Sequence, residues 1–149
     1  MSASASAPSD DTIRAILTRS RTVAVVGASA NPARPSYGVM RFLQRQGHRV
    51  VPVNPGLAGK TLLGEAVFAR LADIPFAIDM VDIFRRSEAV PAVVAEALAL
   101  DPLPAVIWMQ LGVIAPEAAA QARAAGLEVV MDRCPVIESR RLGLGAAQP

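Results

Sequence analysis

Side chains that could bind a ligand or react with one follow each of five predicted strands in this chain. They are small, polar or basic, and each group comes directly after an apolar run. The groups are, in chain order, Gly27, Ala28, Ser29 and Arg34; Asn54 and Pro55; Phe84, Arg85 and Arg86; Met109, Gln110, Leu111 and Gly112; and Asp132, Arg133 and Cys134. Ligands of parallel α/β sheets bind outside the carboxyl ends of the strands. We therefore expect these residues to surround one cleft.

The turn after the first strand favours an anionic ligand. Gly27, Ala28 and Ser29 form this turn, and a helix is expected to follow it with Ser36 as its N-cap. Backbone N–H groups of such a turn and of a helix N-terminus attract phosphate, and Arg34 lies between the two in the sequence. The prediction for this end of the cleft is a phosphate-bearing ligand.

A nicotinamide dinucleotide fits this sequence poorly. Its fingerprint is G-x-G-x-x-G, and this chain has Ser29 and Pro32 where the second and third glycines belong. The second strand ends in Asn54, whereas Asp or Glu at that place would bind the ribose hydroxyls. A nucleotide with an extra phosphate on its ribose stays open, because that anion prefers Asn54, a backbone N–H and a nearby Lys60 or Arg to a carboxylate.

Few side chains in this sequence are suited to a catalytic role. The sequence has no Ser-His-Asp set, no metal-binding cluster and no Walker loop. Asp82 and Asp132 meet at strand ends in one interpretation, as a general acid and base. In the other interpretation they cap turns or pair with Arg85 and Arg133. Arg85 itself either contacts the ligand or forms a salt bridge to Asp82 or Glu88.

Alternating strands and helices must position these groups. The predicted strands are 22–26, 49–53, 77–84, 104–108 and 128–131, with a short strand at 66–68. The predicted helices are 10–20, 36–46, 87–100 and 116–125, with a helical turn at 71–75 and a short helix from 136. This alternation predicts an α/β fold, a Rossmann-like doubly wound parallel sheet of about five strands with helices on both faces. Asp79 and Asp82 are expected near the ends of their strand.

Length and composition restrict the class of protein. With 149 residues, of which 52% are hydrophobic, the chain can form one domain, expected over 9–142 between disordered tails at 1–8 and 143–149. Its apolar runs are too short to span a membrane. A net charge of +2 and 4% aromatic residues do not favour nucleic-acid binding. The single cysteine cannot form an internal disulfide, and a cytoplasmic location is expected.

Five blocks of the sequence resemble the family of stand-alone CoA-binding domain proteins. The blocks are Val26-Gly27-Ala28-Ser29 with Arg34-Pro35-Ser36-Tyr37-Gly38; Val51-Pro52-Val53-Asn54-Pro55; Val81-Asp82-Ile83-Phe84-Arg85-Arg86-Ser87; Trp108-Met109-Gln110-Leu111-Gly112; and Val130-Met131-Asp132-Arg133-Cys134. They occur in the family's order and extend over residues 22–142. The family's fold is similar to the N-terminal CoA-binding domain of succinyl-CoA synthetase alpha subunits.

The resemblance implies a Rossmann-like domain that binds coenzyme A (CoA) or an acyl-CoA. The implied contacts are Gly27, Ala28, Ser29, Arg34 and Ser36 around the pyrophosphate, Asn54 and Pro55 toward the adenosine, and Phe84, Arg85, Met109, Gln110, Leu111 and Gly112 along the walls of the cleft. The chain departs from the synthetase subunit at Leu57, where the subunit has a lysine, and only Lys60 is close. The contact to the 3′-phosphate is therefore not assigned. The synthetase's phosphohistidine belongs to a further domain, and His48 is expected on solvated surface.

The expected function is a small CoA-binding protein that acts as a binding or regulatory module without catalysis of its own. The alternatives are a CoA ligase or acyl-transfer subunit that needs a partner chain, a nicotinamide-dependent oxidoreductase, and an interaction domain that binds no nucleotide. Cys134 is either a buried structural cysteine or a nucleophile at the mouth of the cleft. In the second case its thiol would form a mixed disulfide with the sulfur of the coenzyme.

Overall fold

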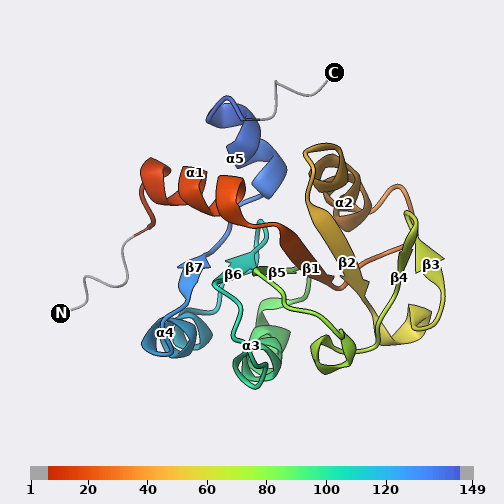
Figure 1. The fold of residues 1–149 in the computed structure, drawn as a ribbon. Helices are drawn as coiled ribbons and strands as arrows, with labels where there is room; N and C mark the ends of the chain where they lie inside the picture. The colour runs from red at the N-terminus through yellow and green to blue at the C-terminus, as the bar shows by residue number, and fades with distance from the viewer. Residues whose placement is uncertain (1–6, 145–149) are drawn as a thin grey trace.

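The computed structural model describes residues 7–144, which form a parallel sheet between two layers of helices (Figure 1). The strands of the sheet are β1 (Thr22–Val26), β2 (Arg49–Val53), β5 (Met80–Ile83), β6 (Val106–Met109) and β7 (Glu128–Val130). Helices α1 (Asp10–Arg19), α2 (Pro35–Arg45) and α5 (Pro135–Arg141) cover one face, and α3 (Val90–Leu98) and α4 (Pro116–Ala124) cover the other. Of the two predicted tails, residues 1–6 and 145–149 lie outside the described residues. Within residues 7–144, no helix is long and apolar enough to cross a membrane.

The strand order is β2-β1-β5-β6-β7, and every neighbouring pair is parallel. After β2 the chain forms the 3₁₀ turn η2 (Pro55–Leu57), the hairpin of β3 (Thr61–Leu62) and β4 (Glu65–Ala66), and the 3₁₀ turn η3 (Leu71–Asp73). It then returns to form β5 on the far side of β1. The winding direction therefore reverses between β1 and β5, which is where such sheets bind their ligands. The predicted Rossmann-like doubly wound sheet is confirmed.

Two apolar cores flank the sheet because successive strand residues point to opposite faces. The core under α1, α2 and α5 contains Val23, Val25, Met80, Val106, Trp108 and Val130 from the strands. The core under α3 and α4 contains Ala24, Val26, Val81, Ile83, Ile107 and Val129. Strands that are covered on both faces carry apolar side chains almost throughout. Thr22, Arg49 and Glu128 stand at the starts of their strands, and Asp82 in β5 is the one charged strand residue that is fully buried, with 0% exposure.

Several element boundaries differ from the prediction for local reasons. Asp79 lies directly before β5 and not within it. Its carboxylate accepts the N–H groups of Arg21 and Thr22 at 2.9 Å each, and these bonds fix the start of β1. The prediction that Asp82 lies near a strand end is wrong, since it is the third of four residues in β5. The helix predicted with Ser36 as N-cap begins at Pro35, because proline at the first helical position loses no helical hydrogen bond.

Two further segments are shorter than predicted. The strand expected at 66–68 is divided: Glu65 and Ala66 form β4, and Phe68 makes a single parallel bridge to Val53. The helix expected over 87–100 begins with the 3₁₀ turn η4 (Ser87–Ala89) and continues as α3. The predicted turn at 71–75 is present as η3, and α5 begins at Pro135, one residue before the predicted start.

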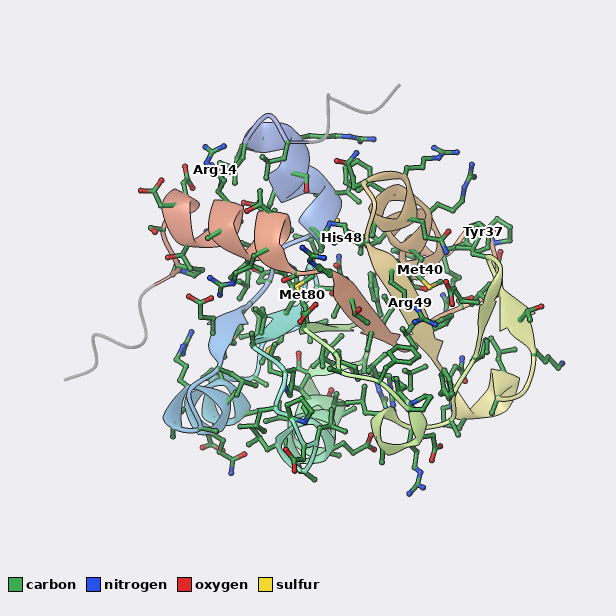
Figure 2. All side chains as sticks on the ribbon, in the orientation of Figure 1. Arg14, Tyr37, Met40, His48, Arg49 and Met80 are labelled. Carbon is green, nitrogen blue, oxygen red and sulfur yellow. The ribbon has the colours of Figure 1, made fainter. Side chains whose placement is uncertain are left out.

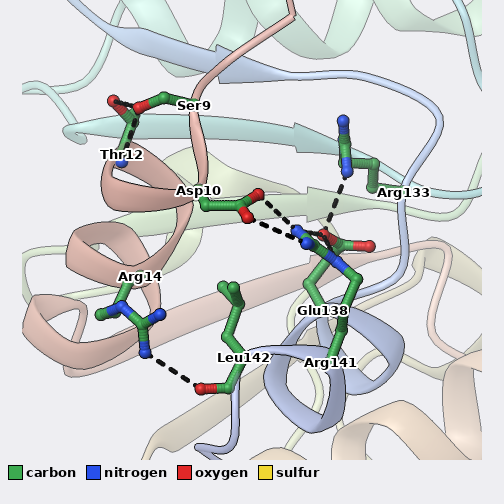
Figure 3. Close-up of polar contacts among 8 residues, drawn as sticks. All are labelled: Ser9, Asp10, Thr12, Arg14, Arg133, Glu138, Arg141 and Leu142. Carbon is green, nitrogen blue, oxygen red and sulfur yellow. Dashed lines mark hydrogen bonds and ion pairs between the residues drawn. The ribbon is translucent and has the colours of Figure 1, made fainter.

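An ion-pair cluster of Asp10, Arg133, Glu138 and Arg141 joins α1 to α5, and we call it the α1–α5 seam (Figure 3). Glu138 is 5% exposed and accepts from Arg133 at 3.0 Å and from Arg141 at 2.7 Å. Arg141 also reaches Asp10 at 2.8 Å, and this hydrogen bond lowers the pKa of Asp10 and raises that of Arg141. The seam fixes the segment that follows β7.

Candidate functional site

A cavity of about 620 Å³ opens at the carboxyl edge of the sheet, between the segments that follow β1, β5, β6 and β7. Its lining is Gly27, Ala28, Ser29, Arg34, Pro35, Ser36, Val39, Asn54, Phe84, Arg85, Arg86, Gln110, Leu111, Gly112, Val113 and Cys134. We call it the carboxyl-edge cavity. Its position matches the point of strand reversal between β1 and β5, where the fold directs a ligand.

Gly27 allows the loops after β1 and β5 to approach closely. Its φ is +88°, and a Cβ atom built on it would lie 2.3 Å from the carbonyl oxygen of Phe84. The same two loops are joined by the Phe84 N–H, which donates to the carbonyl of Val26 at 2.8 Å. Only glycine satisfies both the left-handed backbone and the close contact at this position.

The N–H groups of the turn after β1 are occupied within the chain. Those of Gly27 and Ala28 donate to the carbonyl of Val53 at 3.0 and 3.3 Å, and that of Ser29 donates to the Ser36 hydroxyl at 3.1 Å. The expectation that these three groups point at an anion is therefore wrong. A phosphate at this place has to be bound by side chains and by the N-terminus of α2.

Three arginines supply positive charge to the cavity. Arg34 precedes α2, and Arg85 and Arg86 follow β5, so all three come from loops on either side of the strand reversal. All three are exposed, and none forms an ion pair with any acidic residue in the described part of the chain. The predicted alternative, a salt bridge from Arg85 to Asp82 or Glu88, is not formed. The cavity therefore presents guanidinium groups that are free for an anionic ligand.

The loop after β6 is held in place from both sides. The N–H of Gly112 donates to the Asp132 carboxylate at 2.7 Å, and the N–H of Ile114 donates to the Ser87 hydroxyl at 2.9 Å. Asp132 has a φ of +60°, a strained backbone conformation for a residue with a side chain. This wall of the cavity is therefore formed before any ligand binds.

A second cavity of about 420 Å³ adjoins the first around the end of β2. Gly27, Asn54 and Arg85 line both cavities, and Pro55 lines only the second. The Asn54 side chain donates to the carbonyl of Ala28 and accepts from the N–H of Gly56, both at 2.8 Å. Asn54 therefore ties together the loops that separate the two cavities.

The structure brings most of the predicted site residues together. Eleven of the thirteen implied contacts line the carboxyl-edge cavity, Pro55 lines the second cavity, and Met109 is fully buried at the end of β6. Arg86 and Cys134 also line the first cavity; the sequence places them at strand ends but not among the ligand contacts. Pro35, Val39 and Val113 were missed. The one available signal was the i, i+4 spacing of Pro35 and Val39 at the start of a helix.

The carboxylate pair considered for acid–base catalysis is not formed. Asp82 lies within β5, β6 separates it from β7, and Asp132 accepts the N–H of Gly112 instead. Neither carboxylate oxygen of Asp82 has a hydrogen-bond partner in the described residues, and burial raises its pKa well above the usual range. Asp82 does not line either cavity. Asp132 therefore has the turn-capping role that was the other interpretation.

His48 lies away from the cavity, at the start of β2 beside the end of α1 (Figure 2). Its Nδ1 is 2.7 Å from the carbonyl oxygen of Ser20, and burial lowers the pKa of the imidazole. The expectation of a solvated histidine is wrong, since the ring is half-buried. Among residues 7–144, no group of three or more His, Cys, Asp or Glu side chains is arranged to hold a metal ion.

Comparison with known proteins identifies several relatives. Residues 21–140 match a family described as CoA binding domain. The uncharacterized protein YneT of Bacillus subtilis is 39% identical over 127 residues, which are 85% of this chain and 91% of that protein. The solved structure of cell-free ID.343 from Thermus thermophilus is 41% identical, has a TM-score of 0.85, and covers 91% of this chain and 99% of its own. A hypothetical protein from Pyrococcus horikoshii is 36% identical, with a TM-score of 0.85 and coverage of 91% and 92%.

Proposed function

Because this chain belongs to the CoA binding domain family, we propose that it binds coenzyme A or an acyl-CoA in the carboxyl-edge cavity, as a module without catalysis of its own. One observation carries the proposal: three arginines without acidic partners among the described residues line one part of a cavity of about 620 Å³. The rest of the lining is neutral. This division matches a ligand that has phosphates at one end and an uncharged arm at the other.

The charged part of the cavity suits the phosphates of the coenzyme. Arg34, Arg85 and Arg86 offer planar guanidinium groups, which bind phosphate oxygens in pairs. Ser36 lies in the first turn of α2, an 11-residue helix whose N-terminus adds a favourable field for an anion. Side chains and this helix end supply the attraction that the occupied N–H groups of the Gly27 turn cannot.

The adjoining cavity suits the adenosine. It is lined by Asn54, Pro55 and Gly56 at the end of β2 and shares Arg85 with the first cavity. A ligand that bridges the two would place its phosphates beside Arg85 and its base beside Pro55. Lys60 lines neither cavity, which favours an arginine as the contact to the 3′-phosphate.

The chemistry of the lining supports binding in preference to catalysis. Within the described residues, the titratable side chains of the carboxyl-edge cavity are the three arginines and Cys134. The adjoining cavity adds Arg70 and Glu96, and the Glu96 carboxylate accepts the N–H of Leu71 at 3.4 Å. General acid–base catalysis uses groups such as His, Asp or Glu within hydrogen-bond reach of the substrate. Asp82 and Asp132 are not part of the lining: Asp82 is buried within β5, and Asp132 accepts the N–H of Gly112.

A thermal-shift panel tests the proposal with CoA, acetyl-CoA, dephospho-CoA, NAD and NADP. A ligand at about 100 times its Kd raises the free energy of unfolding by about 2.7 kcal/mol, which shifts the melting temperature by several degrees in a domain of this size. We expect CoA and acetyl-CoA to produce that shift and NAD to produce none. The difference between CoA and dephospho-CoA measures the contact to the 3′-phosphate.

Other outcomes of the panel would overturn the proposal. A shift with only NAD or NADP would mean that the cavity binds a dinucleotide despite Asn54 at the end of β2. No shift with any of the five compounds would favour an interaction domain. Association of the protein with another chain that requires CoA would favour a subunit of a CoA ligase or acyl-transfer enzyme.

A further inference from the structure

The carboxyl-edge cavity contains the one thiol of this chain, far along the sheet from the Gly27 turn. Cys134 follows β7, whereas Gly27 follows β1, and β5 and β6 lie between these strands. Neighbouring strands are about 4.8 Å apart, so the two ends of the cavity are separated by roughly 14 Å. The pantetheine arm of CoA has about as many backbone bonds as four residues and spans a similar length when extended.

Gln110 lies between these two ends, and its side-chain oxygen has no hydrogen-bond partner among the described residues. It is 5% exposed, and it lines the cavity after β6. A buried amide oxygen without a donor is costly unless a ligand or a water molecule donates to it. A primary amide both donates and accepts, as do the two amide groups of pantetheine. Gln110 therefore offers an acceptor to an amide N–H of a ligand on the path from the arginines to Cys134.

Cys134 sits on a fixed segment at the end of that path. It is a free thiol with 8% exposure. Just before it, the indole N–H of Trp108 donates to the carbonyl of Arg133 at 2.8 Å, and the Arg133 side chain pairs with Glu138 in the α1–α5 seam (Figure 3). After it, the N–H of Glu138 donates to the Cys134 carbonyl at 3.0 Å. The thiol is thus held at the cavity wall.

We infer that Cys134 forms a mixed disulfide with the thiol of the bound coenzyme, an inference that rests on the proposed function. The reaction is a thiol–disulfide exchange with CoA disulfide. The Cys134 thiolate attacks one sulfur of the bound disulfide, the S–S bond breaks, and a new bond forms between Sγ and the coenzyme sulfur. The second CoA leaves as a thiolate and takes up a proton. One protein thiol is oxidised and one CoA thiol is released, so the step needs no other oxidant.

The physical advantage of the cavity is proximity. When the arginines hold the phosphates, the CoA disulfide is bound next to Cys134. The effective concentration of the disulfide at the thiolate is then in the millimolar range. At micromolar disulfide, the exchange with CoA disulfide is therefore faster than with a disulfide that the cavity does not bind. The protein then stores CoA covalently under oxidising conditions and releases it when thiols reduce the bond.

Intact-mass spectrometry of the purified protein tests this inference. The protein is mixed with micromolar CoA disulfide or, separately, glutathione disulfide, and the fraction carrying an adduct is followed over time. We expect one CoA adduct, reversed by dithiothreitol and formed at least tenfold faster than the glutathione adduct. Because the chain has one cysteine, Cys134→Ser should remove the adduct.

Further variants and a competitor separate positioning from simple thiol reactivity. Arg85→Ala and Gln110→Leu should slow the CoA reaction several-fold and leave the glutathione reaction unchanged. Excess CoA analogue without the sulfur should also slow the CoA reaction several-fold, because it competes for the cavity. Equal rates with the two disulfides, or no adduct in a protein whose melting temperature is raised by CoA, would overturn the inference and leave the proposed function intact. Absence of any thermal shift with CoA would overturn both.

Discussion

Arginines have opposite surroundings in two regions of this molecule. In the α1–α5 seam, Arg133 and Arg141 are paired with Glu138 and Asp10 (Figure 3). Around the carboxyl-edge cavity, Arg34, Arg85 and Arg86 have no acidic partner among the described residues. Paired guanidiniums join elements of the fold, whereas unpaired ones at the carboxyl edge of a parallel sheet are available to a ligand. In a chain whose basic residues are nearly all arginine, the partners and not the residue type separate the two roles.

Gly27→Ala should have the largest effect, since it alters the geometry on which the cavity depends. The new Cβ would lie 2.3 Å from the Phe84 carbonyl oxygen, and a φ of +88° disfavours a side chain. The loops after β1 and β5 would have to separate. We expect a loss of about 2–4 kcal/mol in the free energy of unfolding, measured by urea denaturation, and loss of CoA binding.

Gly47→Ala is the matched control. Gly47 has a similar φ of +96°, but a Cβ atom added there would have no neighbour within 4 Å. This variant should lose only about 1 kcal/mol from backbone strain and should bind CoA as before. Equal losses in the two variants would mean that backbone conformation alone, and not the contact between the loops, makes glycine necessary at position 27.

Arg85→Ala should affect binding and leave the fold intact. A hydrogen bond to a charged group contributes about 1.5–3 kcal/mol, so titration calorimetry should show a rise of about tenfold or more in the Kd for CoA. Urea denaturation of the free protein should be nearly unchanged, because Arg85 has no ion-pair partner in the described residues.

Arg141→Ala should destabilise the fold and leave CoA binding intact, the opposite of the result expected for Arg85→Ala. It removes the hydrogen bonds to Asp10 and Glu138, so the melting temperature should fall while the Kd for CoA stays the same. A weaker affinity in this variant would show that the seam also controls the cavity, through the segment that contains Cys134.

The sequence predicted which residues gather at the carboxyl edge of the sheet better than it predicted the contacts that they make there. Parallel strands bring their carboxyl ends to one edge, so strand ends alone placed Gly27, Arg85 and Gln110 in one cavity. Met109 is buried because β6 extends one residue beyond the predicted strand end and the sheet is covered on both faces. The occupied N–H groups of the Gly27 turn depend on Val53, a partner distant in the sequence. Local patterns cannot show such pairing.

Asp82 is a third setting for a charge: a carboxyl group with neither a partner among the described residues nor solvent. Burial raises its pKa in the folded protein above the unfolded value of about 3.9. Below about pH 4 the group is protonated in both states. Above that pH the unfolded chain ionises while the folded chain keeps its proton, so stability falls as the pH rises, by about 1.4 kcal/mol per pH unit until the raised folded pKa is reached.

Asp82→Asn should remove this dependence. The measurement is the free energy of unfolding in urea for both proteins between about pH 5 and pH 8, where Asp10 has already titrated. The lowered pKa of His48 gives the opposite slope, stability rising with pH up to about 6.5, but it does so in both proteins and cancels in the difference. The advantage of the variant over the natural protein should therefore grow as the pH rises. Parallel curves would mean that Asp82 is ionised in the folded state, and that a group as yet unidentified satisfies it beneath the cavity.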